Sequence, residues 1–125
     1  MIETLFENED LIVINKPEGM SAIPERQKDP PPAESLYEWL CARRGEEIFI
    51  VHRIDKDTSG IILFARTAEA HRRLSLEFQR RLVHKEYLAL THGVIAADEG
   101  AIDKPLGQRG SGRVSVSPQH GRESY

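Results

Sequence analysis

Residues 51–66 read VHRIDKDTSGIILFAR, and the fold is decided by the change of character inside this stretch. The residues that lead into it, Ile48 to Val51, and the apolar run Ile61 to Ala65 are each typical of a buried β-strand. The charged and turn-forming residues between them predict a polar loop carried on two rigid strands. Loops held in this way often carry a protein's chemistry, so this loop is the candidate site.

Asp55 stands at the centre of the loop. If Arg53 and Asp55 lie in extended backbone, their side chains project to one face while Ile54 points to the other. A cation beside a carboxylate favours the ionised carboxylate near neutral pH. An ionised aspartate can serve as a nucleophile, a base or a metal ligand, so the loop alone leaves the chemistry open.

The composition excludes several classes of protein. A chain of 125 residues with 39% hydrophobic and 30% charged residues fits one globular domain at most. Its longest apolar run, Ile61 to Ala65, is far too short to span a membrane. The single cysteine, Cys41, excludes an intrachain disulfide and fits a reducing compartment, so we expect a cytoplasmic location and no membrane partner.

Charge is unevenly distributed along the chain. Residues 1–47 hold 11 acidic and 5 basic residues, a net charge of −6, whereas residues 48–125 hold 9 acidic and 12 basic residues, a net charge of +3. A local basic face can attract phosphate groups even where the whole protein is acidic. The alternative is a solvated helix face with no partner.

The remaining pattern predicts an α+β fold. We expect strands at Thr4–Phe6, Leu11–Ile14, Val83–Thr91, Gly100–Asp103 and Arg113–Ser117, and an exposed proline-rich loop at residues 24–34. One helix should begin at a capping box formed by Ser35 and Glu38 and end at Gly45. A second should follow Thr67 as N-cap, with Leu74 and Phe78 towards the core. Short connections favour a mixed, mainly antiparallel sheet with flanking helices.

Metal chemistry fits the loop poorly. Residues 55–60 imitate the first half of an EF-hand, but Arg66 stands where a bidentate glutamate is required, and the scattered histidines form no zinc pattern. A magnesium-dependent aspartyl phosphotransferase, with Asp55 as nucleophile and Asp57 as acid/base, needs further carboxylates. The later pair Asp98 and Glu99 is its only source, so this alternative is the less favoured one and we expect no metal.

Four segments in order resemble the RluA-type pseudouridine synthases. Residues 52–67 are similar to that family's His-Arg-Leu-Asp…Thr-Ser-Gly signature and following strand, with Ile54 for Leu and Arg66 for Lys. Residues 13–19 resemble its Asn-Lys-Pro-x-Gly segment, residues 70–79 its next helix, and residues 85–90 its Lys-x-Tyr-x-Ala segment. The resemblance covers essentially the whole chain, and four ordered matches make it specific.

The resemblance implies isomerisation of uridine to pseudouridine in structured RNA, rRNA or tRNA, without cofactor or metal. Asp55 matches the catalytic aspartate, which acts as a nucleophile on a nucleotide taken out of its stack. Tyr87 matches a tyrosine that packs on the target base, and its alternative role is that of an ordinary strand aromatic. Arg53 matches an arginine that fills the vacated space, and its alternative role is a salt bridge to Asp55.

We expect further RNA contacts from His52 and Lys56 in the loop and from Arg80 and Arg81 at the end of the basic helix. The resemblance also implies that residues 1–125 form the N-terminal part of one catalytic domain. The family's later Arg-Thr-His-Gln-Ile-Arg-like stretch has no counterpart here, and neither does an S4-type RNA-binding domain. We therefore expect an apparently truncated fold, completed by a missing C-terminal half or a partner, and little activity of the chain alone. A catalytically inactive RNA-binding remnant is the alternative.

Overall fold

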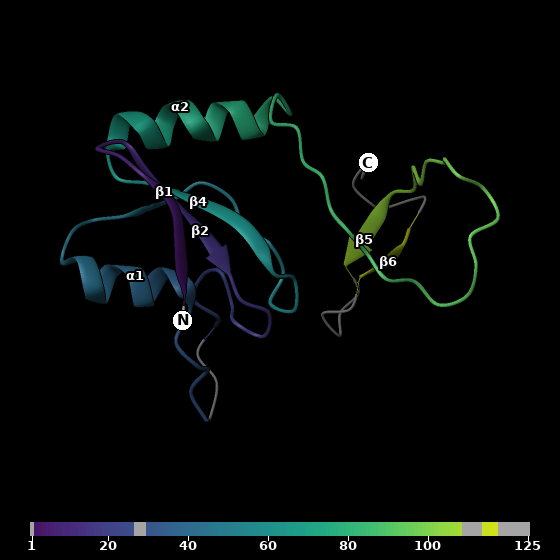
Figure 1. Ribbon diagram of the computed structural model, residues 1–125, viewed down its shortest axis with the longest axis horizontal. Helices are drawn as coiled ribbons and strands as arrows, with labels where there is room; N and C mark the ends of the chain where they lie inside the picture. Colours follow the sequence, from purple (N-terminus) through teal and green to yellow (C-terminus); the bar gives the residue numbers. More distant parts are fainter. Residues whose placement is uncertain (1, 27–29, 109–113, 118–125) are drawn as a thin grey trace. The chain divides into compact units, whose positions relative to one another are not determined.

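The computed structural model describes residues 2–26, 30–108 and 114–117 (Figure 1). The chain forms two compact units, Met1–Glu86 and Tyr87–Tyr125, which are described separately. Within the described ranges, no helix has the length and apolar character needed to cross a lipid bilayer.

An antiparallel four-stranded sheet forms the centre of the first unit (Figure 1). Its spatial order is β1-β2-β4-β3, and its strands are β1 (Glu3–Glu7), β2 (Leu11–Lys16), β3 (Phe49–Ile50) and β4 (Gly60–Ala65). The long central pair β2–β4 places Ile14 opposite Ile62 and Lys16 opposite Gly60. The predicted antiparallel α+β fold is confirmed for this unit, with β3 shorter than expected.

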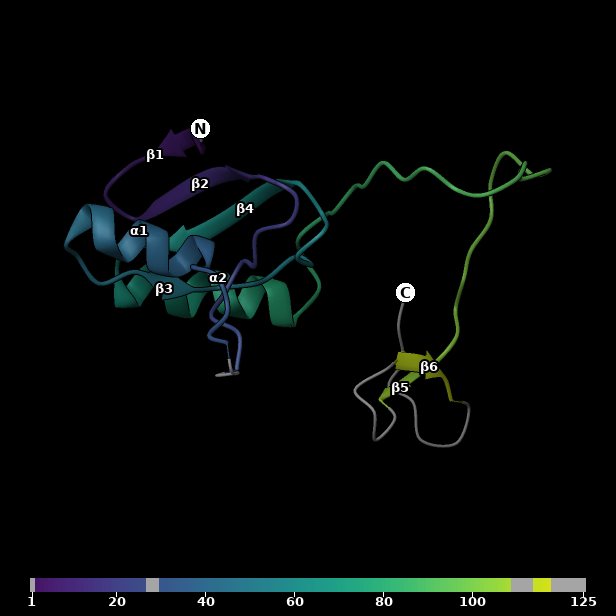
Figure 2. The same cartoon turned by 90° about the horizontal axis from the view of Figure 1, so that it is seen from below.

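The core lies on the face of the sheet that packs against α1 (Leu36–Arg44). Alternate residues of β2 and β4 are fully buried there, as the two-residue period of a strand requires. The buried cluster is Ile12, Ile14, Ala22, Leu36, Leu40, Ile48, Ile62 and Phe64. The opposite face carries α2 (Ala68–Gln79), so the two helices flank the sheet (Figure 2).

Both helices begin as predicted. The Ser35 hydroxyl accepts a hydrogen bond from the Glu38 backbone N–H, and the Glu38 carboxylate accepts one from the Ser35 N–H at 2.8 Å, which completes the capping box. Gly45 ends α1 with φ 63°, a left-handed conformation that suits glycine. The Thr67 hydroxyl accepts a hydrogen bond from Ala70 N–H at 3.1 Å and caps α2.

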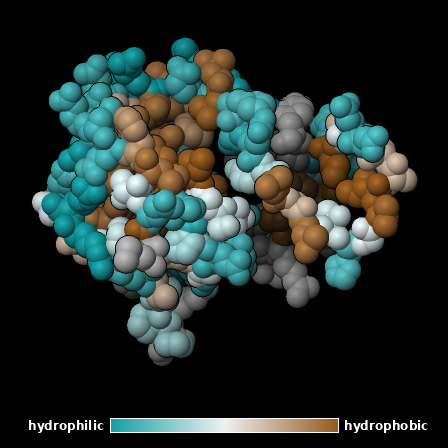
Figure 3. All heavy atoms as spheres, in the orientation of Figure 1, coloured by the Kyte–Doolittle hydropathy of each residue, from teal (hydrophilic) through white to brown (hydrophobic). Residues whose placement is uncertain are grey.

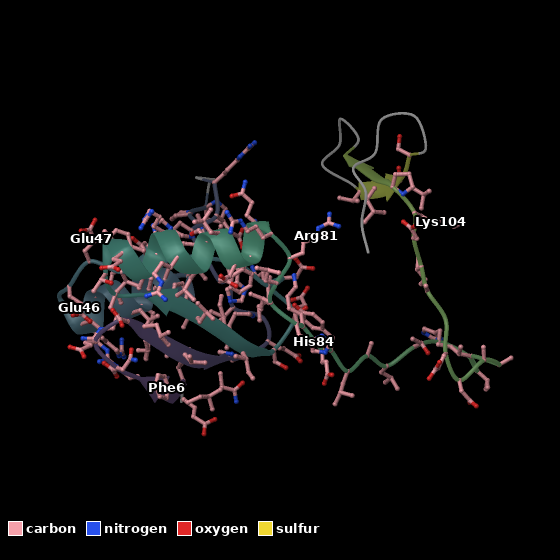
Figure 4. The ribbon with its side chains drawn as sticks, turned by 90° about the horizontal axis from the view of Figure 1, so that it is seen from above. Phe6, Glu46, Glu47, Arg81, His84 and Lys104 are labelled. Atoms are coloured by element: carbon pink, nitrogen blue, oxygen red, sulfur yellow. The ribbon has the colours of Figure 1, made fainter. Side chains whose placement is uncertain are left out.

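Arg66 joins three segments at the other end of β4. Its guanidinium makes two hydrogen bonds to the Glu46 carboxylate, at 3.0 and 3.1 Å, and an ion pair with Glu7 at 3.1 Å (Glu46 is labelled in Figure 4). Arg44 also binds Glu7, so the end of α1 is tied to β1. Figure 3 shows hydrophobic residues gathered over the strands between the two helices. Leu5 and Phe6 of β1 are among the exposed apolar side chains.

The strand prediction for Val83–Thr91 is wrong. No strand hydrogen-bonds to this segment within the part of the chain that the structure describes. A strand needs a neighbour for its backbone groups, and alternation alone does not supply one. Leu88 and Leu90, which the predicted strand contains, are fully exposed.

The second unit contains a two-stranded antiparallel sheet, β5 (Leu106–Gln108) and β6 (Val114–Val116). The prediction of a strand within Arg113–Ser117 is confirmed for Val114–Val116, and Arg113 lies outside the described residues. The strand expected at Gly100–Asp103 is wrong, because Leu106–Gln108 is the segment that pairs with β6.

Candidate active site

The polar loop between β3 and β4 presents Asp55 to solvent. Ile54 is only 8% exposed, whereas Arg53 and Asp55 on either side of it are exposed. The buried isoleucine anchors the loop to the core, and the two polar side chains are left outside. This in-and-out order is the one that the sequence predicted.

Two hydrogen bonds hold the backbone at Asp55 and at the residue after it. The Asp55 carbonyl accepts a hydrogen bond from Thr58 N–H at 3.1 Å, so residues 55–58 form a β-turn with Asp55 first. The next carbonyl, that of Lys56, accepts a hydrogen bond from the Lys16 ammonium at 2.9 Å. The carboxylate therefore extends from a held turn and not from a loose segment.

Lys16 is the only charged side chain that is buried among the described residues, at 0% exposure. Its ammonium donates three hydrogen bonds, to the carbonyls of Pro17 and Met20 at 2.8 Å each and to that of Lys56. These account for all three of its N–H groups. Lys16 thus fastens the turn after β2 to the loop that carries Asp55.

Burial lowers the pKa of Lys16, and the charges of Asp57 and Asp55 act in the opposite direction. The ammonium contributes a fixed positive charge beneath the loop carboxylates without pairing directly with either one. From the sequence, Lys16 was placed only within residues 13–19, the segment that resembles an Asn-Lys-Pro-x-Gly motif, and no role was predicted for it. Its position two residues after Ile14, on the buried face of β2, was the available signal.

His52 lies inward, at the start of the loop. Its Nε2 accepts a hydrogen bond from Leu63 N–H at 3.2 Å, and its ring stacks on Phe78 of α2 with centroids 4.3 Å apart. Burial, and then the charge of Lys85, lowers the pKa of this imidazole, which agrees with its acceptor role. The geometry gives His52 a structural part between β4 and α2, and its predicted contact with RNA stays a prediction.

Arg53 does not take the alternative role that the sequence left open. Within the described residues it forms no ion pair with Asp55 or with any other carboxylate. Instead it lines an open hollow together with Lys56. Lys56 itself forms an ion pair with Glu25 at 3.3 Å and remains half exposed.

The predicted RNA contacts Arg80 and Arg81 directly follow α2, whose last turn packs against the start of the loop through Phe78 and His52. Arg80 follows the last helical residue, and Arg81 has φ 57°, which turns the chain sharply as the helix ends. Both side chains are exposed, and Arg81 and His84 are labelled in Figure 4 where the chain leaves the helix. Their binding to RNA stays a prediction.

Tyr87 is the first residue of the second unit, and its side chain is 62% exposed. The structure brings Asp55, Arg53 and Lys56 together in one loop and does not include Tyr87 in the same unit.

Among residues 2–26, 30–108 and 114–117, no three His, Cys, Asp or Glu side chains are grouped as metal ligands would be.

Known proteins are similar to this chain in sequence over most of its length. A family described as RNA pseudouridylate synthase matches residues 10–124. The dual-specificity RNA pseudouridine synthase RluA of Vibrio vulnificus is 39% identical over 104 residues, which are 83% of this chain and 40% of the relative. The tRNA pseudouridine synthase C of Haemophilus ducreyi is 39% identical over 107 residues, 84% of this chain and 42% of the relative.

Two solved human structures have the same fold. The RNA pseudouridylate synthase domain containing 1 protein superposes with a TM-score of 0.75 at 23% identity, over 99% of this chain and 48% of that one. The domain containing 4 protein gives 0.69 at 22% identity, over 96% and 50%. The chain thus spans about two-fifths of the curated relatives it matches and about half of the solved ones.

Proposed function

This chain belongs to the RNA pseudouridylate synthase family, and from that premise we propose that it contributes the catalytic aspartate of an enzyme that isomerises uridine to pseudouridine in RNA. The observation that carries the proposal is Asp55, exposed at the first position of a turn whose backbone is held by Lys16 and Thr58. The names of two relatives, a dual-specificity RNA enzyme and a tRNA enzyme, support rRNA or tRNA as the substrate class.

In the proposed reaction the Asp55 carboxylate acts on the target nucleotide after it has left its stack. The bond between uracil N1 and the ribose breaks, and the carboxylate forms an adduct or stabilises the cationic sugar. The base then rotates, and a bond forms between ribose C1′ and uracil C5 as any bond to Asp55 breaks. The C5 proton is lost, and N1, freed from the ribose, takes up a proton from solvent. No redox step is involved, and the atoms of the nucleotide are conserved.

The remaining predicted residues have supporting parts in this proposal. Arg53, exposed and without an ion pair among the described residues, would fill the space that the flipped base leaves. Tyr87 would pack on the target base and accept the C5 proton. We also propose a cytoplasmic location, in keeping with the single Cys41 and with an RNA substrate.

A second candidate is an RNA-binding chain without catalytic activity. The observation that favours it is that the exposed cations Arg53, Lys56 and Arg80 can attract RNA phosphates without any chemical step. In that case the basic loop and the arginines after α2 would still bind RNA. The two candidates differ in whether Asp55 is required for a chemical change in the RNA.

The test is tritium release from RNA labelled at uracil C5, measured for this chain and for the gene's whole product. The Asp55→Ala variant should lose release completely in any form of the protein that shows it. Asp57→Asn is the matched control, since it changes a second exposed loop carboxylate and should keep most activity. Release that survives Asp55→Ala would overturn the enzyme proposal, and binding of RNA without release from any form would support the second candidate.

A further inference from the structure

A hollow of about 440 Å³ opens beside the loop that carries Asp55. One wall is the segment Ser21–Arg26, which follows β2, and the other consists of Arg53, Ile54 and Lys56. The residues immediately before and after Asp55 thus both belong to its lining. A ligand held here would lie next to the proposed nucleophile.

The hollow is lined by three cations, Arg26, Arg53 and Lys56, and by one carboxylate, Glu25. Glu25 accepts a hydrogen bond from the Ser21 hydroxyl and pairs with Lys56, so its charge is engaged inside the lining. In the part of the chain that the structure describes, Arg26 and Arg53 form no ion pair. Two guanidinium groups therefore line the same hollow, and no carboxylate of the described residues pairs with either one. Such an arrangement favours binding of a phosphate group.

The walls of the hollow are held in place from behind. Leu36 N–H donates a hydrogen bond to the Ser21 carbonyl at 2.8 Å, and Tyr37 N–H donates one to the Ala22 carbonyl at 3.2 Å, which ties the first wall to α1. The second wall is held by Lys16 through the Lys56 carbonyl. Ala22 and Ile54 are buried and make the floor apolar, which strengthens electrostatic attraction above it. A site that is already ordered in this way pays little conformational entropy when it binds a ligand.

We propose that this hollow binds a phosphate of the RNA backbone adjacent to the target uridine, with Arg26 as a phosphate contact on the wall opposite Asp55. The proposal rests on the proposed function for its ligand. Arg26 comes from a segment that none of the predicted RNA contacts includes, so it extends the RNA-binding surface from one loop to two. Glu25 limits the attraction by competing with the phosphate for Lys56.

The first experiment measures binding of a fluorescently labelled RNA stem–loop with uridines in its loop, at KCl concentrations from about 50 to about 200 mM. Arg26→Ala should weaken binding about tenfold at the lowest salt and reduce the slope of log affinity against log salt by about one. Arg43→Ala is the matched control, because Arg43 lies near the far end of α1 and stacks over Trp39. It should leave both quantities unchanged.

A variant of opposite sign separates phosphate binding from a distorted loop. Glu25→Gln removes the competing charge and should tighten binding about twofold to fivefold. If Glu25→Gln weakens binding as Arg26→Ala does, both act by disturbing the loop and the proposal is overturned. Circular dichroism of each variant checks that the fold is kept.

Replacing single phosphates of the stem–loop by neutral methylphosphonates locates the contact. One position should cost the wild-type protein about tenfold and cost Arg26→Ala almost nothing, because the two changes remove the same interaction. Equal losses at every position in both proteins, or wild-type affinity in Arg26→Ala, would overturn the phosphate site. These binding outcomes do not depend on Asp55, so a failed hollow and a failed tritium-release test are distinguishable.

Discussion

The Lys16 ammonium donates a 2.9 Å hydrogen bond to the Lys56 carbonyl, one residue after Asp55 and 40 positions away from Lys16 in sequence. A buried cation thus holds the main chain of the candidate catalytic loop, while the side chain of Lys56 itself stays half exposed outside. The rigidity of the Asp55 turn consequently depends on a residue that belongs to β2 and not to the loop.

Lys16→Met should lower the free energy of unfolding by about 2 to 3 kcal/mol, because three part-buried hydrogen bonds from the ammonium to backbone carbonyls are lost. Lys56→Met is the matched control. It removes a half-exposed ammonium but keeps the Lys56 carbonyl, so the change should stay within about 0.5 kcal/mol. Urea unfolding of both variants measures the difference, and equal small losses would show that the three hydrogen bonds contribute little.

Local signals predicted the elements of the first unit well. Helix α1 is an example, because Ser35, Glu38 and Gly45 specify its two ends within one short stretch. The position of Asp55 was predictable for a similar reason, since a polar loop between two apolar runs is visible without tertiary information. The same reasoning failed at Val83–Thr91, where the sequence has the pattern of a strand but no strand of the described residues pairs with it.

The supports of the site were harder to predict because they depend on long-range contacts. No role was predicted for Lys16, because the carbonyls that accept its hydrogen bonds come from a separate turn and from a loop 40 residues away. His52 was predicted to contact RNA. Its stacking on Phe78 depends on the packing of α2 against the sheet, which the sequence does not reveal. A side chain's direction at a loop boundary is set by what packs over it.

Ser35→Ala should destabilise the first unit by about 1 to 2 kcal/mol, since the capping box at α1 loses the acceptor for the Glu38 N–H. Ser75→Ala, within α2, is the matched control and should be neutral or slightly stabilising, because alanine favours a helix interior. Thermal unfolding measures both changes. A similar fall in melting temperature for the two variants would contradict a capping role.

Gly60→Ala should cost about 1 to 3 kcal/mol. Gly60 has φ 123°, a conformation that residues with a Cβ rarely adopt, and it pairs with Lys16 where the loop enters β4. An added Cβ would meet no atom within 4 Å, so the cost is one of backbone conformation and not of collision. Gly100→Ala, also in open space but without such a φ, should be near neutral in the same urea titration.

His52 should make stability depend on pH below neutrality. Its pKa in the folded protein is lowered, first by burial and then by Lys85, whereas the unfolded chain binds a proton near the ordinary value of about 6.5. As the pH falls below that value, the unfolded state takes up a proton that the folded state resists, so stability is lost from about pH 6.5 down to the lowered pKa. Protonation of Nε2 would also remove the acceptor of the Leu63 N–H hydrogen bond.

The measurement is urea unfolding of wild type and His52→Gln at several pH values between about 5 and about 8. Wild type should lose more stability than the variant across that range, because glutamine does not titrate. A His71→Gln control, which changes a second half-buried histidine stacked on Phe49, should retain the wild-type difference. Parallel pH profiles for wild type and His52→Gln would mean that the His52 ring is protonated as readily in the folded chain as in the unfolded one. The loop that carries Asp55 would then not depend on a neutral imidazole at its entrance.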